Sequence, residues 1–423
     1  MKDNTATREQ LIQLYQAVRN QTETQCKELA IEDYVIQSID DVSPPKWHLA
    51  HTTWFFETFL LRLHLPKYKI FHDEFHYLFN SYYQSIGNPY PRAKRGLLSR
   101  PTVKTIFEYR HYVDQCFIDY LQQIESVELA NLSATILLGI HHEQQHQELL
   151  LMDIKHNFSI HLEFPVYHKH KLDNAPSQLK QLKFIHTEGG IVEVGHLGNE
   201  FCFDNELPRH AHILNSYAMA NRLVTNAEYC EFIEMGGYQK PDWWLSDGWE
   251  CVSKNHWQAP LYWQKSQGKW HVFTLSGLQE LNPAEPVSHV SYYEADAYAR
   301  WCGFRLPSEI EWEYYVYKNE INPDIGNFLE NDVLHPTSNN NSKNQQLFGD
   351  VWEWTTSAYS PYPGYKSLHG ALGEYNGKFM SNQFVLRGGS CVTPQSHIRA
   401  TYRNFFQPDK RWQFSGIRLA SDA

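Results

Sequence analysis

The chain has 423 residues, of which 42% are hydrophobic, and a formal net charge of −11 at pH 7. This length exceeds one ordinary hydrophobic core and predicts two domains, while an acidic balance without any Lys/Arg run excludes a surface for nucleic-acid phosphates. The N-terminus is polar and no 18 consecutive residues are apolar, so we expect a soluble cytoplasmic protein without a membrane partner.

The cysteines are odd in number and scattered, and none forms a CxxC pair. This pattern favours reduced thiols over a disulfide framework or a zinc ribbon. The seven positions are Cys26, Cys116, Cys202, Cys230, Cys251, Cys302 and Cys391.

Two helices are expected at the start of the chain. Apolar residues at helical spacing predict the first over residues 5 to about 26. Ser43-Pro44-Pro45 suits the start of a second helix that runs to about Leu65. His48 and His51 lie near that start. Alone, either is more often a capping or core residue, but one of them can reach a bundle core as a third metal ligand.

An irregular stretch follows, from Phe79 to Pro101, rich in Gly and Pro. A loop this long in a compact domain is usually functional. Its arginines suit carboxylate recognition and its tyrosines suit proton or hydrogen-bond donation, although solvated charges and packing aromatics are an equal alternative. These residues are Arg92, Arg95, Arg100, Tyr82 and Tyr83.

Helical spacing returns over residues 102 to about 125 and 129 to about 158. The total of four long helices predicts a four-helix bundle over residues 1–160, with ligands projecting into its core. Residues 161–183 have the composition of a linker. Beyond Phe184 the sequence changes to short segments with many Gly and Trp, and we expect only two helices there, near residues 226–235 and 291–301. Residues 184–423 are therefore predicted to form a mixed α+β domain.

The segment His142-Glu143-Gln144-Gln145-His146 lies within the fourth helix. Positions i and i+4 share one helix face, so the two histidines are spaced to grip one metal ion. As a zinc peptidase site, Glu143 would be the general base; as a non-haem iron site, another imidazole would join the pair and leave open positions for oxygen and substrate. A polar helix face that is merely rich in His is a third interpretation. The helical spacing of the two histidines does not distinguish among these three interpretations.

The C-terminal half resembles the formylglycine-generating-enzyme-like fold, a C-type-lectin-like α+β architecture that also serves as a binding scaffold. A non-catalytic binding module is thus a further interpretation. The catalytic pair of formylglycine-generating enzymes is two cysteines; here Cys391 is followed by Ser396 where the second is expected, so we do not expect that oxidase activity. The resemblance rests on Val224–Tyr229, Pro286–Tyr292, Arg305–Glu313, Val351–Trp354 and Leu386–Ser390.

The N-terminal half resembles DinB-like bundles through Trp47–Thr52 and His142–Glu148. The two halves together resemble the sulfoxide synthases of ergothioneine biosynthesis over nearly the whole chain. That resemblance implies that Fe(II) is held by His51, His142 and His146. It also implies that His48 and His141 are neighbours without a bond to the metal.

The same resemblance implies the reaction. These synthases use O2 to join a thiol donor to hercynine (trimethylhistidine) and oxidise the sulfur to a sulfoxide. It implies that Gln145 hydrogen-bonds the substrate imidazole and that Tyr82 or Tyr83 delivers a proton or electron. Arg92, Arg95 and Arg100 would bind the amino-acid carboxylate, since guanidinium groups match carboxylates in two-point contacts.

The sequence departs from part of this family after Tyr402-Arg403. Members that use γ-glutamylcysteine have an acidic residue shortly after the Tyr-Arg-Asn block, whereas here Asn404 is followed by Phe405 and Phe406. We therefore expect the branch that uses free cysteine, with Asn404 at the betaine end of hercynine. Relatives that use unmethylated histidine or a selenium donor remain alternatives, and the sequence leaves the oligomeric state open.

Overall fold

The computed structural model describes residues 7–169, 181–338 and 346–423. It divides into two compact units, which are treated separately below. The first comprises Met1–Leu162, Gly198–Phe203 and Leu368–Tyr375; the second comprises Glu163–Leu197, Asp204–Ser367 and Asn376–Ala423. Residues 170–180 of the predicted linker 161–183 lie outside the described residues.

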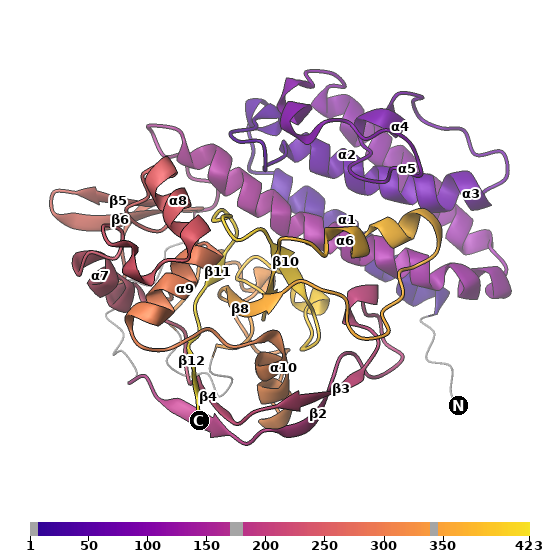
Figure 1. Ribbon diagram of the computed structural model, residues 1–423. Helices are drawn as coiled ribbons and strands as arrows, with labels where there is room; N and C mark the ends of the chain where they lie inside the picture. The colour runs from indigo at the N-terminus through magenta and orange to yellow at the C-terminus, as the bar shows by residue number, and fades with distance from the viewer. Residues whose placement is uncertain (1–6, 170–180, 339–345) are drawn as a thin grey trace. The chain divides into compact units, whose positions relative to one another are not determined.

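The first unit is built on helices α1 (Arg8–Cys26), α2 (Pro45–Phe56), α5 (Val103–Gln123) and α6 (Ser126–Ser159). The predicted N-terminal helical domain is confirmed. Thr7 starts α1 with a capping box to Gln10, and Pro45 occupies the first turn of α2. Helix α6 packs along α1 and α2, and α2 packs against α5 (Figure 1).

Helix α2 continues into the π-helix η2 (Glu57–Leu61) and the short α3 (Arg62–His64), so the helical run ends close to the predicted Leu65. The carboxylate of Glu57 is buried and accepts hydrogen bonds from the hydroxyls of Tyr68 at 2.6 Å and Tyr109 at 2.7 Å. These two bonds replace the water that the carboxylate loses on burial. The bond from Tyr109 joins the end of this helical run to α5, and the bond from Tyr68 joins it to the chain that follows α3.

Gly139 lies where α6 meets α2. A Cβ atom at this position would lie 2.8 Å from ring atoms of both Phe55 and Phe56. Glycine therefore permits these two helices to approach closely at a point one turn before His142. A short helix, α4 (Phe75–Leu78), directly precedes the predicted loop from Phe79 to Pro101. That loop is irregular, as expected, apart from the 3-10 helix η3 (Arg92–Leu97).

The second unit contains short strands in small sheets together with helices, and the predicted mixed α+β domain is confirmed. One sheet has the order β10-β9-β8-β11, in which β9 pairs antiparallel with both β8 and β10. Its strands are β8 (Trp352–Ala358), β9 (Phe384–Arg387), β10 (Asn404–Phe406) and β11 (Ser415–Gly416). A second sheet has the order β1-β4-β12: β1 (Phe184–Thr187), β4 (Tyr217–Ala220) and β12 (Ala420–Asp422). The others are β2 (Gly190–Val194) with β3 (His210–Leu214), and β5 (Trp263–Ser266), β6 (Lys269–Thr274) and β7 (Gly277–Glu280).

The expectation of only two helices beyond Phe184 was wrong. Helices α7 (Asn226–Glu234) and α9 (Tyr292–Trp301) lie where they were predicted, but α8 (Ser246–Asn255) and α10 (Glu309–Lys318) are also present. Ser308 and Glu311 form a capping box at the start of α10, a pattern readable from the sequence. Helix α8 has no side-chain cap at Leu245 and spans only ten residues, so its signal is weak.

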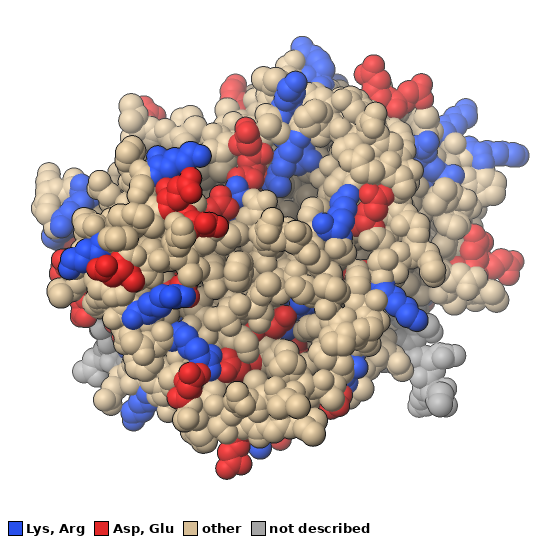
Figure 2. Space-filling model, in the orientation of Figure 1, with Lys and Arg blue, Asp and Glu red and all other residues tan. Residues whose placement is uncertain are grey.

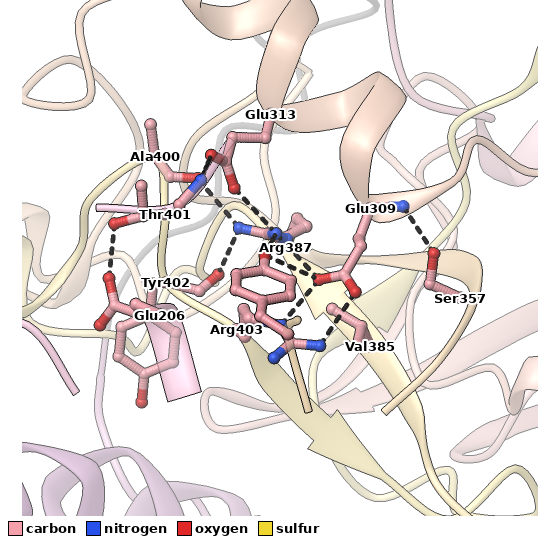
Figure 3. Close-up of polar contacts among 12 residues, drawn as sticks. Glu206, Glu309, Glu313, Ser357, Val385, Arg387, Ala400, Thr401, Tyr402 and Arg403 are labelled. Atoms are coloured by element: carbon pink, nitrogen blue, oxygen red, sulfur yellow. Dashed lines mark hydrogen bonds and ion pairs between the residues drawn. The ribbon is translucent and has the colours of Figure 1, made fainter. Parts of the chain in front are cut away.

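A buried ion cluster joins α10 to β9 and to Arg403, the residue directly before β10 (Figure 3). Arg387 donates to Glu309 at 2.9 Å and to Glu313 at 3.0 Å, and Arg403 donates to Glu309 at 2.8 Å. A buried charge is tolerated when it is paired and hydrogen-bonded in this way. The cluster fixes the backbone next to Asn404.

Surface charges of both signs are interspersed on the face that Figure 2 shows, with uncharged surface between them. Within the described residues, no helix combines the length and apolar character needed to cross a membrane. All seven cysteines are described, and all are free thiols.

Candidate metal centre

Three histidines converge in the core of the first unit. His51 comes from α2, and His142 and His146 come from one face of α6. Each offers one ring nitrogen, and these three atoms lie within 4.8 Å of one another. All three side chains are buried. Three imidazoles at this separation form a ligand set for one transition-metal ion.

The hydrogen bonds of these rings leave nitrogens available to a metal. His51 Nδ1 lies 2.6 Å from the carbonyl oxygen of Phe79, and because a carbonyl only accepts, Nδ1 carries the proton. His51 Nε2 and both ring nitrogens of His142 are buried and make no hydrogen bond in the described structure. Buried polar atoms normally have partners, so these orphaned nitrogens fit a metal ion.

The environment keeps the rings neutral. Burial lowers the pKa of His142 to about 3 and holds the pKa values of His51 and His146 well below the usual range. A neutral imidazole has the lone pair that a metal requires. At neutral pH, protons therefore do not compete for the lone pairs of these three rings.

His51 lies between two indole rings of its own helix. Trp47 is stacked on it with ring centroids 4.5 Å apart, and Trp54 is stacked on it at 5.7 Å. The spacing of these residues along α2, four before and three after, places all three on one face. The two indoles restrict the rotation of His51 and hold its Nε2 toward the other ligands.

Glu143 is poorly suited to act as a general base. Its carboxylate accepts bonds from Arg19 at 2.9 Å, Arg110 at 2.5 Å and Thr22 at 2.7 Å, and the residue is fully buried. Burial raises its pKa, but Arg110 and Arg19 lower it more, to about 2. A carboxylate held by two cations is a poor proton acceptor. The zinc-peptidase interpretation, which rested on Glu143, gains no support.

The two predicted tyrosines lie in the same unit. Tyr83 is buried and Tyr82 is half-buried, with their hydroxyl oxygens 3.4 Å apart. The Tyr83 ring lies 5.6 Å from that of Trp54. Burial raises the pKa of both phenols. Both are therefore protonated at neutral pH and able to donate.

A third tyrosine, Tyr375, was not predicted. Its ring lies 5.6 Å from that of His142 and 6.3 Å from that of Tyr82, and its hydroxyl donates a hydrogen bond to Gln145 Oε1. The preceding Glu374 anchors this segment by accepting backbone N–H bonds from Gln84 and Ser85, each at 2.9 Å. No periodicity marks residues 368–375, which fold with the first unit although they follow most of the second in sequence.

The three predicted arginines differ in their placement. Arg95 is buried, donates to the hydroxyls of Ser43 at 2.9 Å and Ser81 at 3.0 Å, and lies 3.4 Å from the ring centroid of Trp47. The other two are exposed: Arg92 donates to the carbonyl of Asp41, and Arg100 donates to that of Ser99 at 3.1 Å. Of the three arginines, Arg95 alone contacts Trp47, the residue that stacks on His51 of the histidine triad.

The predicted residues Asn404, Phe405 and Phe406 form β10 in the second unit. Phe405 is stacked on Tyr359 with centroids 4.0 Å apart, and Phe406 lies edge-on to Trp412 at 5.4 Å. Their part in substrate binding stays a prediction.

Comparison with known sequences identifies both halves. The family described as "Sulfatase-modifying factor enzyme 1-like domain" matches residues 169–317 and 328–423, and the DinB superfamily matches residues 13–150. The chain is 34% identical over 240 residues to the hercynine oxygenase of Mycobacterium tuberculosis, covering 52% of this chain and 56% of that protein. It is 32% identical over 255 residues to the hercynine oxygenase of Mycolicibacterium smegmatis, covering 55% of this chain and 59% of the relative. It is also 27% identical over 232 residues to ergothioneine biosynthesis protein 1 of Schizosaccharomyces pombe, covering 52% of this chain and 28% of that protein. The chain thus spans little more than half the length of the first two relatives.

Proposed function

The chain belongs to the sulfatase-modifying factor enzyme 1-like family, which matches more than half of its residues, and on this premise we propose that it acts in ergothioneine biosynthesis. The proposed reaction is the iron- and oxygen-dependent joining of L-cysteine to hercynine, giving hercynylcysteine sulfoxide. The observation that carries it is the buried triad of His51, His142 and His146, in which His51 and His142 have ring nitrogens without a hydrogen-bond partner. The names of the relatives supply the substrate class.

The triad fits Fe(II) by its donor chemistry. Imidazole nitrogen suits first-row transition metals, and three such ligands leave further coordination positions open. Iron, when bound, would supply the redox chemistry that dioxygen requires. The chain's own residues then have to bind the two organic substrates, exclude water and deliver protons.

The proposed reaction balances with dioxygen as its only oxidant. The thiol S–H bond and one imidazole C–H bond break, and a C–S bond and an S=O bond form. One oxygen atom enters the sulfoxide, and the other leaves as water with the two released protons. Forming the thioether removes two electrons from the substrates and oxidising its sulfur removes two more, which matches the four electrons that O2 accepts.

Several side chains are candidates for these tasks. Gln145 lies between the two histidines of α6 and would hold the imidazole of hercynine through its amide. Tyr375, Tyr82 and Tyr83 would donate protons, because burial keeps the phenols of the latter two protonated. Among Arg92, Arg95 and Arg100, we propose Arg95 as the carboxylate partner nearest the metal, since it packs on Trp47. Asn404 would contact the betaine end.

The test is anaerobic reconstitution with Fe(II), followed by O2 with cysteine and hercynine and mass spectrometry of the product. The sulfoxide should form with iron and not with zinc, and His142→Ala should abolish it. Histidine in place of hercynine, and selenocysteine in place of cysteine, would be offered in the same mixture. Preferential use of either would replace the proposed substrate, and product formation with zinc alone would overturn the iron chemistry.

A further inference from the structure

A line of three side chains leads from the metal centre to a buried carboxylate. His146 contacts His48, and His48 contacts Asp153. We propose that Asp153 and His48 are positioning residues that fix the tautomer of His146 and make it the most strongly donating of the three metal ligands. This inference rests on the proposed metal centre and not on the identity of the substrates.

The geometry of the line is closely defined. His48 Nδ1 lies 2.8 Å from His146 Nδ1, and His48 Nε2 lies 3.0 Å from Asp153 Oδ2. All three residues are at least nine-tenths buried. Asp153 follows His146 by seven residues, two turns along the same face of α6, and His48 precedes His51 by three residues on α2. The line therefore runs alongside both helices that carry ligands.

The protons along this line can be assigned from one end. The Asp153 carboxylate, when ionised, only accepts, so His48 Nε2 carries a proton. A neutral His48 then has a bare Nδ1, which must accept from His146 Nδ1. His146 therefore carries its proton on Nδ1 and leaves Nε2 bare for a metal. The opposite arrangement would place the proton of a neutral His146 on Nε2, where it would block coordination.

The three ligands have unequal support. His51 donates to a backbone carbonyl, and the nitrogens of His142 make no hydrogen bond in the described structure. His146 alone among them is linked through another imidazole to a carboxylate. A carboxylate behind a metal-bound imidazole increases its basicity and fixes its ring. The ligand set is thus asymmetric although all three members are histidines.

Asp153 also holds the chain where α2 starts. Its Oδ2 accepts the backbone N–H of Ser43 at 2.7 Å, two residues before Pro45. The same carboxylate oxygen therefore joins α6 to the start of α2 and to His48. Replacing Asp153 with Asn preserves its volume and an amide oxygen for Ser43 while removing the charge, which separates electronic support from packing.

The experiment compares Asp153→Asn and His48→Gln with wild type in the full chain, using Co(II) as the probe. We expect Co(II) affinity, followed by visible absorption, to fall about 10- to 100-fold in both variants. The Fe(III)/Fe(II) midpoint potential should become more positive, because the more oxidised ion gains more from the donating ligand. His335→Gln is the matched control: His335 is buried in the second unit, and its Nε2 lies 3.0 Å from Oε2 of Glu285. It should leave both quantities unchanged.

We call the line Asp153–His48–His146 the relay. If Asp153→Asn had the Co(II) affinity and the Fe(III)/Fe(II) midpoint potential of the wild type, the proposed role of the relay would be overturned. If His48→Gln fails to fold, as judged by circular dichroism, the nearly isosteric Asp153→Asn decides alone. His142→Ala tests the premise, since unchanged Co(II) binding in that variant would overturn the metal centre and the relay together. Weakened binding in Asp153→Asn with no sulfoxide from the wild type would uphold the relay and overturn only the proposed reaction.

Discussion

The hydroxyl of Tyr375 donates a hydrogen bond to Oε1 of Gln145, the residue directly before His146, one of the proposed metal ligands. The contact places a phenol beside the ring of His142, with centroids 5.6 Å apart. A donor at this position is directed at the face of α6 from which the proposed ligands project.

Replacing Tyr375 with Phe should therefore impair turnover without emptying the metal site. We expect kcat for sulfoxide formation to fall about 10²- to 10⁴-fold, the usual contribution of a positioned proton donor. Co(II) affinity should stay within twofold, since the hydroxyl bonds Gln145. Tyr365→Phe removes a comparable hydroxyl, one that donates to Asp204 in the second unit at 2.9 Å, and serves as control. Unchanged turnover in Tyr375→Phe would remove this tyrosine from the proposed chemistry.

Glu143 should be a stability residue. Its replacement by Gln removes the fully buried carboxylate that Arg19 and Arg110 share and leaves each of them only its more exposed partner, Asp114 or Glu23. Breaking a buried ion pair in this way costs about 3–5 kcal/mol. Urea unfolding monitored by circular dichroism measures this loss. The control is Glu23→Gln, because Glu23 pairs with Arg110 at 3.0 Å but its side chain is 38% exposed; an exposed pair contributes about 1 kcal/mol or less. Abolished peptide hydrolysis with unchanged stability would instead favour the zinc-peptidase alternative.

The ion cluster of the second unit predicts a pH-dependent difference in stability. Burial raises the pKa of Glu309, but Arg403 and Arg387 lower it more, so its folded pKa lies below the ordinary value of 4.5. Ionised Glu309 therefore stabilises the fold above its unfolded pKa, and the contribution is lost as pH falls through the lower folded pKa. Glu309→Gln should be less stable than wild type at pH 7, by about 3–5 kcal/mol.

The gap should narrow as pH falls below about 4.5, the range in which Glu309 takes up a proton. Burial raises the pKa of the neighbouring Glu313, so the difference between wild type and Glu309→Gln, rather than either curve alone, reports Glu309. Thermal unfolding over pH 3–8 gives both curves, and a constant gap would contradict the assignment.

The thiol donor provides a further prediction. If Phe405 and Phe406 line the donor site, γ-glutamylcysteine has to bury its extra charged groups without partners. That costs about 1–3 kcal/mol for each polar group, enough for at least tenfold discrimination. We expect a higher kcat/KM for cysteine, with the gap narrowed in Phe406→Asp. Equal use of both donors by the wild type would show that these rings lie elsewhere.

Much of the fold was predictable from the sequence, because long helices show a regular spacing of apolar residues. The runs that became α1, α5 and α6 were placed within a few residues. Helix α8 was missed because it begins without a side-chain cap, whereas α7 and α9, of similar length, begin with capping boxes. The π-helix after Phe56 was also unpredictable, since the bonds of Glu57 to Tyr68 and Tyr109 depend on tertiary packing.

The site divides in the same way. His142 and His146 follow from helical spacing. Their position near a helix start made His48 and His51 both candidates for the third ligand, and only the resemblance selected His51. Tyr375 was missed because it reaches the site by a chain excursion of more than 200 residues from Gln145. The proposed role of Asp153 was not predicted either. Its spacing of seven residues from His146 shows only that the two side chains share a face of α6.

The free cysteines bear on the proposed use of a small thiol as substrate. Burial is the largest cause of a raised pKa at five of them, to about 12 at Cys26 and about 11 at Cys230 and Cys302, with smaller rises at Cys116 and Cys251. The thiolate is the form that attacks electrophiles, binds iron and is oxidised. These five sulfurs are therefore almost wholly protonated at neutral pH, and in the proposed reaction they would compete little with a thiol substrate for iron or for oxidant.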